Sequence, residues 1–165
     1  EWNQELENHL LATDYDLVIN SNSTLVHDGE QKPAESFVSA VMTWQMAGHK
    51  VLLIRDNPKP NVSDAVSDFR FCIEQFGDAA ATECSTPIER ALQVNDLMYE
   101  LGSGLMGVES LDFTELMCPD GVSCPVIMDD LIVYRDGSHI TSQFAITLID
   151  EFELKLKELR VLPAN

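Results

Sequence analysis

The sequence predicts a three-layer α/β/α fold, in which helices cover both faces of a parallel β-sheet. Two apolar runs of strand length, residues 17–19 and 51–54, carry no polar side chain. Each run follows a segment whose apolar residues recur at helical spacing. Strands that are apolar throughout are typical of parallel sheets covered on both faces. The alternation of helix and strand therefore favours a layered α/β domain, with functional loops at the carboxyl ends of the strands.

The remaining elements are predicted from the same patterns. A helix is expected at the start of the chain, and a second runs from Pro33 to a stop at Gly48. We expect further helices at residues 62–76 and 86–101 and a third strand at residues 108–113. Two short apolar pieces follow at residues 126–128 and 131–134, and a last long helix at residues 141–159. The helix at 86–101 is expected to begin at Thr86-Pro87, because proline suits the first helical position. Thr141 or Ser142 is expected to cap the last helix.

The length and the net charge of the chain limit the number of domains and the classes of function. The 165 residues suffice for one domain with one core, so we expect a single domain over residues 1–165. The chain opens on Glu1-Trp2-Asn3 without a methionine and enters a helical pattern at once, so we expect this domain to be incomplete at its N-terminus. The net charge of −18 opposes binding to nucleic acid. No apolar run reaches the roughly 18 residues that a membrane span needs.

Four cysteines form two local pairs, Cys72 with Cys84 and Cys118 with Cys124. Neither pair has the spacing or the neighbouring histidines of a structural zinc site. Two disulfides in an oxidising compartment are the favoured interpretation. The alternative is four buried free thiols that pack as small hydrophobic side chains.

The candidate catalytic feature is the stretch Arg135-Asp136-Gly137-Ser138-His139. A hydroxyl nucleophile needs an imidazole as its base and a carboxylate that fixes the imidazole tautomer. A separation of three residues across a turn lets both side chains face one cleft. The residues alone leave a second interpretation open, an ordinary surface turn in which His139 caps the following helix.

Several stretches resemble the SGNH hydrolases, and above all the domains fused to acyltransferase-3 membrane proteins. YRDGSHIT, residues 134–141, is similar to their last sequence block, and the cysteine-bearing approach to it, residues 116–133, is similar as well. Three further stretches resemble the same family. A strand of the family is similar to DYDLVINS, and its next strand with a proline loop is similar to GHKVLLIRDNPKP. The helix that precedes the first of these strands is similar to the opening EWNQELENHL. The resemblance implies an SGNH-hydrolase-like, flavodoxin-like sandwich.

The resemblance also implies roles for particular residues. His139 would be the general base and Asp136 its orienting carboxylate. Asn20 and Asn22 stand where the family places an oxyanion-hole donor, although its Gly-x-Asn-Asp pattern is absent. The family's Gly-Asp-Ser block with the nucleophile is also absent, so the nucleophile is expected upstream of this chain. Ser21 and Ser23 lie near the same strand end and are the less favoured alternatives.

The function that the resemblance implies is acyl transfer through an acyl-serine. The acceptor would be a hydroxyl of an envelope glycan or glycolipid, and the domain would lie outside the membrane, tethered by an upstream acyltransferase-3 domain. Two alternatives remain open, a non-catalytic extracytoplasmic binding domain and a secreted esterase without a membrane partner. No residue set indicates a cofactor or metal site, and His49, directly after Gly48, is expected to cap a helix end.

Overall fold

The computed structural model describes residues 2–21, 34–60, 68–93 and 95–161. Contacts between Cα atoms divide the chain into two compact units. Unit 1 comprises residues 1–56, 95–111 and 156–165, and unit 2 comprises residues 57–94 and 112–155. No helix in the described ranges is both long enough and apolar enough to cross a membrane.

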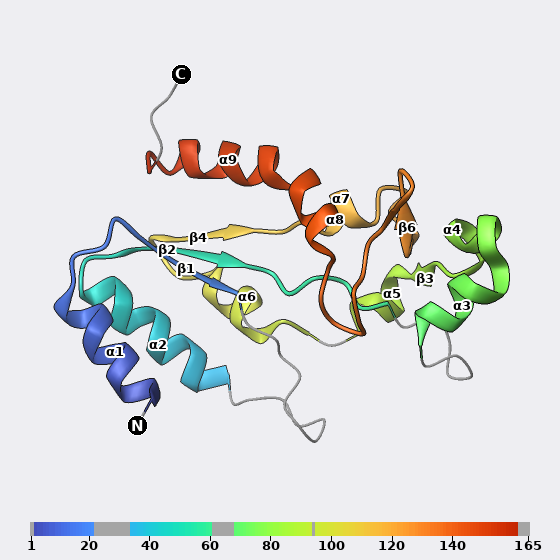
Figure 1. The fold of residues 1–165 in the computed structure, drawn as a ribbon. Coiled ribbons are helices and arrows are strands. Elements are labelled where there is room, and N and C mark those ends of the chain that lie inside the picture. Colours follow the sequence, from blue (N-terminus) through green and yellow to red (C-terminus); the bar gives the residue numbers. More distant parts are fainter. Residues whose placement is uncertain (1, 22–33, 61–67, 94, 162–165) are drawn as a thin grey trace. The chain divides into compact units, whose positions relative to one another are not determined.

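Unit 1 is built on a three-stranded parallel sheet, which confirms the predicted α/β class (Figure 1). The strands lie in the order β1-β2-β4, with Val18 beside Val51 and Val51 beside Val108. The elements of this unit are α1 (Trp2–Ala12), β1 (Leu17–Ser21), α2 (Ala34–Met46), β2 (Lys50–Ile54), α6 (Leu97–Gly102) and β4 (Val108–Leu111). Helices α2 and α6 pack on each other and on β2.

The central strand β2 is covered on both of its faces. Val51 and Leu53 point to one face, where they join Val41 and Trp44 of α2 in a single apolar cluster. Leu52 points to the opposite face and is fully buried as well. The prediction of a strand buried on both sides is therefore confirmed for β2. It is wrong for β1, where Ile19 is 45% exposed.

His49 was expected to cap a helix end, and it contacts the last turns of two helices, its backbone N–H donating to the Trp44 carbonyl of α2 at 3.2 Å. Gly48 ends α2 at a φ of 97°, as predicted, but the His49 ring is buried. Its Nε2 lies 2.7 Å from the carbonyl oxygen of Leu10, and its Nδ1 lies 3.2 Å from that of Tyr15. The His49 ring therefore connects the last turn of α1, and the segment that follows it, to the start of β2.

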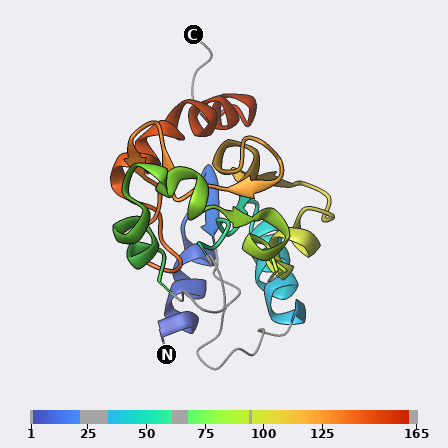
Figure 2. The same ribbon diagram turned by 90° about the vertical axis from the view of Figure 1, so that its right-hand side faces the viewer.

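Unit 2 consists of short helices and two-stranded pieces joined by loops (Figures 1 and 2). Its first half holds α3 (Phe69–Phe76), the 3-10 helix η1 (Gly77–Ala79), α4 (Ala80–Glu83), β3 (Thr86–Pro87) and α5 (Ile88–Ala91). Its second half holds α7 (Thr114–Met117), β5 (Ser123–Cys124), β6 (Ile127–Met128), β7 (Leu131–Ile132), α8 (Ser142–Thr147) and most of α9 (Ile149–Glu158). β3 pairs with β5 and β6 pairs with β7, in both cases antiparallel.

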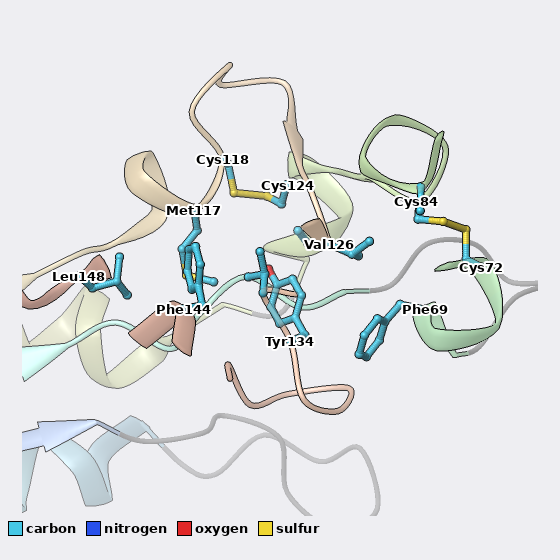
Figure 3. Close-up of a cluster of buried hydrophobic side chains, with 13 residues drawn as sticks. Phe69, Cys72, Cys84, Met117, Cys118, Cys124, Val126, Tyr134, Phe144 and Leu148 are labelled. Atoms are coloured by element: carbon cyan, nitrogen blue, oxygen red, sulfur yellow. A yellow bond between two sulfur atoms is a disulfide. The ribbon is translucent and has the colours of Figure 1, made fainter. Parts of the chain in front are cut away.

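The core of unit 2 gathers around Tyr134 and includes both disulfides (Figure 3). Cys72 is bonded to Cys84 and Cys118 to Cys124, so the predicted pairing is confirmed and the free-thiol alternative is wrong. All four cysteines are buried. The Tyr134 ring meets Phe69 edge to face, with ring centroids 6.1 Å apart. The two bridges thus reinforce an apolar core whose elements are too short to be stable alone.

Two predicted helices are interrupted, each for a local reason. Residues 86–101 do not form one helix, because Thr86 and Pro87 pair with Cys124 and Ser123, and because Asp96 caps a new helix at the Tyr99 N–H. The last helix divides at Leu148. The Thr147 hydroxyl donates to the Phe144 carbonyl at 2.7 Å, and the Leu148 N–H turns to Ala145 instead.

Gly102 allows α6 to approach β2 closely, and we expect Gly102→Ala to destabilise the protein. A Cβ at this position would lie 2.0 Å from Leu53 Cδ1, so the buried Leu53 side chain would have to shift within the core. Overpacking of this kind lowers the free energy of unfolding by about 1–3 kcal/mol. Urea denaturation of the wild type and the variant measures the difference.

Gly104→Ala is the matched control for that measurement. Its Cβ would meet only the Leu101 carbonyl oxygen, at an ordinary 3.6 Å. Equal denaturation midpoints for the Gly102 and Gly104 variants would contradict the close packing of α6 on β2.

The two disulfides give a second prediction. In the chain-entropy account, replacing Cys72 and Cys84 together by alanine should lower the free energy of unfolding by about 3 kcal/mol. Replacing Cys118 and Cys124 together should lower it by about 2 kcal/mol, because that bridge closes a shorter loop. Mass mapping of non-reduced peptides tests the pairing itself. Four free thiols, or peptides linked in a crossed pattern, would refute it.

Candidate functional site

The turn that holds Asp136 and His139 is the tip of a small hairpin in unit 2. Tyr134 and Ile140 form an antiparallel bridge at its base. The Arg135 N–H donates to the His139 carbonyl at 2.8 Å, and the Thr141 N–H donates to the Val133 carbonyl at 2.8 Å. These bonds fix the distance between the two ends of the turn. The side chains at its tip are therefore presented by a closed loop rather than by a free one.

The Asp136 carboxylate organises the tip. Its Oδ1 accepts the backbone N–H groups of Ser138 at 3.0 Å and His139 at 2.9 Å, which is the pattern of an Asx turn. The Arg135 Nε donates to Oδ2 at 3.3 Å. These donors hold the pKa of Asp136 well below its ordinary value, the Ser138 N–H contributing most and the His139 side chain next. The carboxylate is therefore ionised throughout the neutral range.

The expected hydrogen bond between His139 and Asp136 is present. His139 Nδ1 lies 2.8 Å from Oδ1 and 3.0 Å from Oδ2 of the carboxylate. An ionised carboxylate can only accept, so Nδ1 carries the proton and Nε2 keeps its lone pair when the ring is neutral. The ring is 65% exposed, and its Nε2 contacts no donor among the described residues. A base needs this arrangement, with one nitrogen anchored and the other open.

Ser138 is next to the ring but is badly placed as a nucleophile. Its Oγ lies 3.3 Å from His139 Nδ1, which is the nitrogen that already faces Asp136. The same hydroxyl is 3.4 Å from Asp136 Oδ1. A hydroxyl to be activated has to meet the open Nε2, so Ser138 belongs to the support of the turn.

Two neighbouring residues hold the hairpin in place. Thr141 caps α8, accepting the Phe144 N–H at 3.2 Å, and its hydroxyl donates to the Ile132 carbonyl at 2.6 Å. The predicted cap at Thr141 is thus confirmed. Asn57 Nδ2 donates to the Ser138 carbonyl at 3.0 Å and was missed by the sequence analysis. Its only sequence signal is its place in the proline loop, where Pro58 and Pro60 are buried.

The Tyr134 hydroxyl is buried at the base of the hairpin. It has no hydrogen-bond partner among the described residues. Burial raises the pKa of Tyr134 well above its ordinary value, so the phenol is neutral. The side chain therefore anchors the hairpin in the core by packing rather than by charge.

The other expected site residues lie in or beside unit 1. Asn20 is on β1, opposite Leu53, and its Oδ1 is buried without a partner in the described part of the chain. Ser21 ends β1 and is exposed, while Asn22 and Ser23 fall outside the described residues. The expectation that this strand end meets His139 relates the two units, and it stays a prediction.

Comparison with known proteins gives one family. The family described as "SGNH domain (fused to AT3 domains)" matches residues 1–154. No curated protein matches the chain, and no solved structure does.

Proposed function

This chain belongs to the family of SGNH domains fused to AT3 domains, and we propose that it supplies the base and the orienting carboxylate of an O-acyltransferase. The observation that carries the proposal is the 2.8 Å contact between His139 Nδ1 and Asp136, which leaves Nε2 open.

The nucleophile is a serine upstream of residue 1. The sequence holds no Gly-Asp-Ser, and Ser138 is on the wrong side of the imidazole. Among the described strands, β1 lies at the edge of the sheet and pairs with β2 on one side. A further parallel strand along its other edge would bring a serine at its carboxyl end to the end of β1, where Asn20 is a candidate for the oxyanion hole.

The chemistry follows from the arrangement. His139 Nε2 takes the proton of the serine hydroxyl while the oxygen attacks the acyl carbonyl. Asp136 stabilises the resulting imidazolium, and backbone N–H groups hold the oxyanion. The imidazolium protonates the leaving group, and an acyl-serine results. His139 then takes the proton of an acceptor hydroxyl, whose oxygen attacks the acyl-serine, and the serine recovers its proton.

The acceptor is a hydroxyl of an envelope glycan or glycolipid, and the domain acts outside the cytoplasm. The family places such domains beside AT3 domains, and an AT3 domain in the same protein would present the acyl group. Two buried disulfides support an oxidising compartment. No cofactor is part of the proposal.

The placement of the nucleophile predicts that this chain alone hydrolyses no p-nitrophenyl acetate. A chain extended upstream through a Gly-Asp-Ser should hydrolyse it, because only the extended chain has a hydroxyl to meet Nε2. In the extended chain, His139→Ala and Asp136→Asn should each lower kcat by about 10⁴-fold.

His9→Ala is the matched control, since His9 is an exposed histidine on α1 whose Nε2 meets the Tyr15 hydroxyl. It should leave hydrolysis unchanged. Turnover by the short chain that disappears in Ser21→Ala or Ser23→Ala would show that the nucleophile is in this chain. An extended chain that is inactive would instead favour a binding domain.

A further inference from the structure

The peptide bond between Ser138 and His139 is held at both of its polar ends. Its N–H, that of His139, donates to Asp136 Oδ1 at 2.9 Å. Its carbonyl, that of Ser138, accepts from Asn57 Nδ2 at 3.0 Å. The peptide unit is planar, and its N–H and C=O point in opposite directions. Bonds at both ends therefore oppose rotation of this plane more strongly than either bond alone.

The two anchors come from different parts of the chain. Asp136 belongs to the turn itself, so its bond fixes the peptide only relative to the turn. Asn57 is 81 residues away from Ser138, so its bond fixes the peptide relative to the rest of unit 2. The tip of the hairpin has little packing of its own, because the His139 ring is 65% exposed and a Cβ at Gly137 would meet no atom within 4 Å.

The Asn57 amide is oriented by the loop that carries it. Its Nδ2 also donates to the Pro58 carbonyl at 3.2 Å, so the two amide hydrogens have two carbonyl acceptors. Pro58 and Pro60 are buried, and each fixes its own φ. Between them, the Lys59 N–H donates at 2.9 Å to the carbonyl of Ala91, a residue of the unit 2 core. The donor therefore stands on an anchored loop with few free torsions.

The position of the His139 ring follows from this peptide. The ring hangs from the Cα that comes directly after the peptide plane, so rotation of the plane would move the ring and turn the His139 N–H away from Asp136. A general base has to lie within about 3 Å of the proton that it takes. A displacement of about 1 Å can slow a reaction by about 100-fold. The aim of Nε2 thus depends on the bond from Asn57 as well as on Asp136.

We propose that Asn57 is a positioning residue of the candidate base, and that its bond to the Ser138 carbonyl locks the Ser138–His139 peptide and aims Nε2. The inference rests on the proposed function, in which His139 is the base, and adds a residue to it. Asn57 contacts the backbone and not the ring, so the tautomer is still set by Asp136. Its loss should therefore lower kcat and leave both KM and the pH dependence of kcat as in the wild type.

The first test uses NMR on this chain. A coupling across the hydrogen bond, between the Asn57 side-chain nitrogen and the Ser138 carbonyl carbon, detects the contact in the wild type. In Asn57→Leu, which has a similar volume and no donor, exchange of the His139 N–H with water should become about fivefold faster. Exchange of the Thr141 N–H, which donates to Val133 at the base of the hairpin, should stay the same.

The second test uses kinetics on the chain extended upstream through a Gly-Asp-Ser. Asn57→Leu should lower kcat for p-nitrophenyl acetate about tenfold and leave KM unchanged. Gln93→Leu is the matched control for both tests, because it removes an exposed amide of unit 2, and it should change neither exchange nor kcat. Thermal melts show that each variant is folded at the assay temperature.

Wild-type exchange at His139 in Asn57→Leu, or a wild-type kcat for that variant in an active extended chain, would overturn the inference. Equal acceleration of exchange at Thr141 and His139 would also overturn it, because it would show a general loss of stability. If Asn57→Leu does not fold, the absence of the coupling in the wild type is sufficient to overturn it. An extended wild-type chain without activity would instead refute the proposed function, and the exchange rates would still show whether Asn57 holds the peptide.

Discussion

The candidate site depends on one ionised carboxylate. Asp136 accepts two backbone N–H groups and the imidazole Nδ1 within 3.0 Å, and Arg135 adds a longer contact. The backbone bonds shape the turn, and the bond to Nδ1 orients the ring that the turn carries. These bonds hold the pKa of Asp136 below its ordinary value. The carboxylate is therefore ionised at neutral pH and accepts all of them. They are lost only as the pH falls through that lowered pKa. A neutral amide at this position has a single acceptor oxygen and could not accept hydrogen bonds from all these donors.

The rest of unit 2 keeps this turn in place. Tyr134 fixes the base of the hairpin in the core, Thr141 connects its far side to α8, and Asn57 holds the Ser138 carbonyl from the proline loop. The disulfides join elements of only a few residues to the same core. An exposed histidine thus stands on a support whose mobility is restricted, which is what preorganised catalysis requires.

The sequence predicted the parallel sheet, both disulfides and the pairing of Asp136 with His139, because each has a local signature. Apolar runs mark the strands, short separations mark the cysteine pairs, and three residues separate the acid from the base. The interrupted helices were missed, because pairing of Thr86 with Cys124 and the hydroxyl of Thr147 override the helical pattern. Asn57 was missed because it lies 81 residues from Ser138, to whose carbonyl it donates. No spacing rule connects positions so far apart. The proximity of Asn20 to His139 stays a prediction, and so does the position of the nucleophile.

The central claim is that Asp136 holds His139 in the tautomer that a base requires. Long-range ¹H–¹⁵N correlation NMR measures this directly, with the His139 signals assigned by their loss in His139→Gln. At a pH where the ring is neutral, the account predicts a proton on Nδ1 and a bare Nε2. In Asp136→Asn it predicts a loss of that preference. A proton on Nε2 in the wild-type protein, or a tautomer that Asp136→Asn leaves unchanged, would contradict the account.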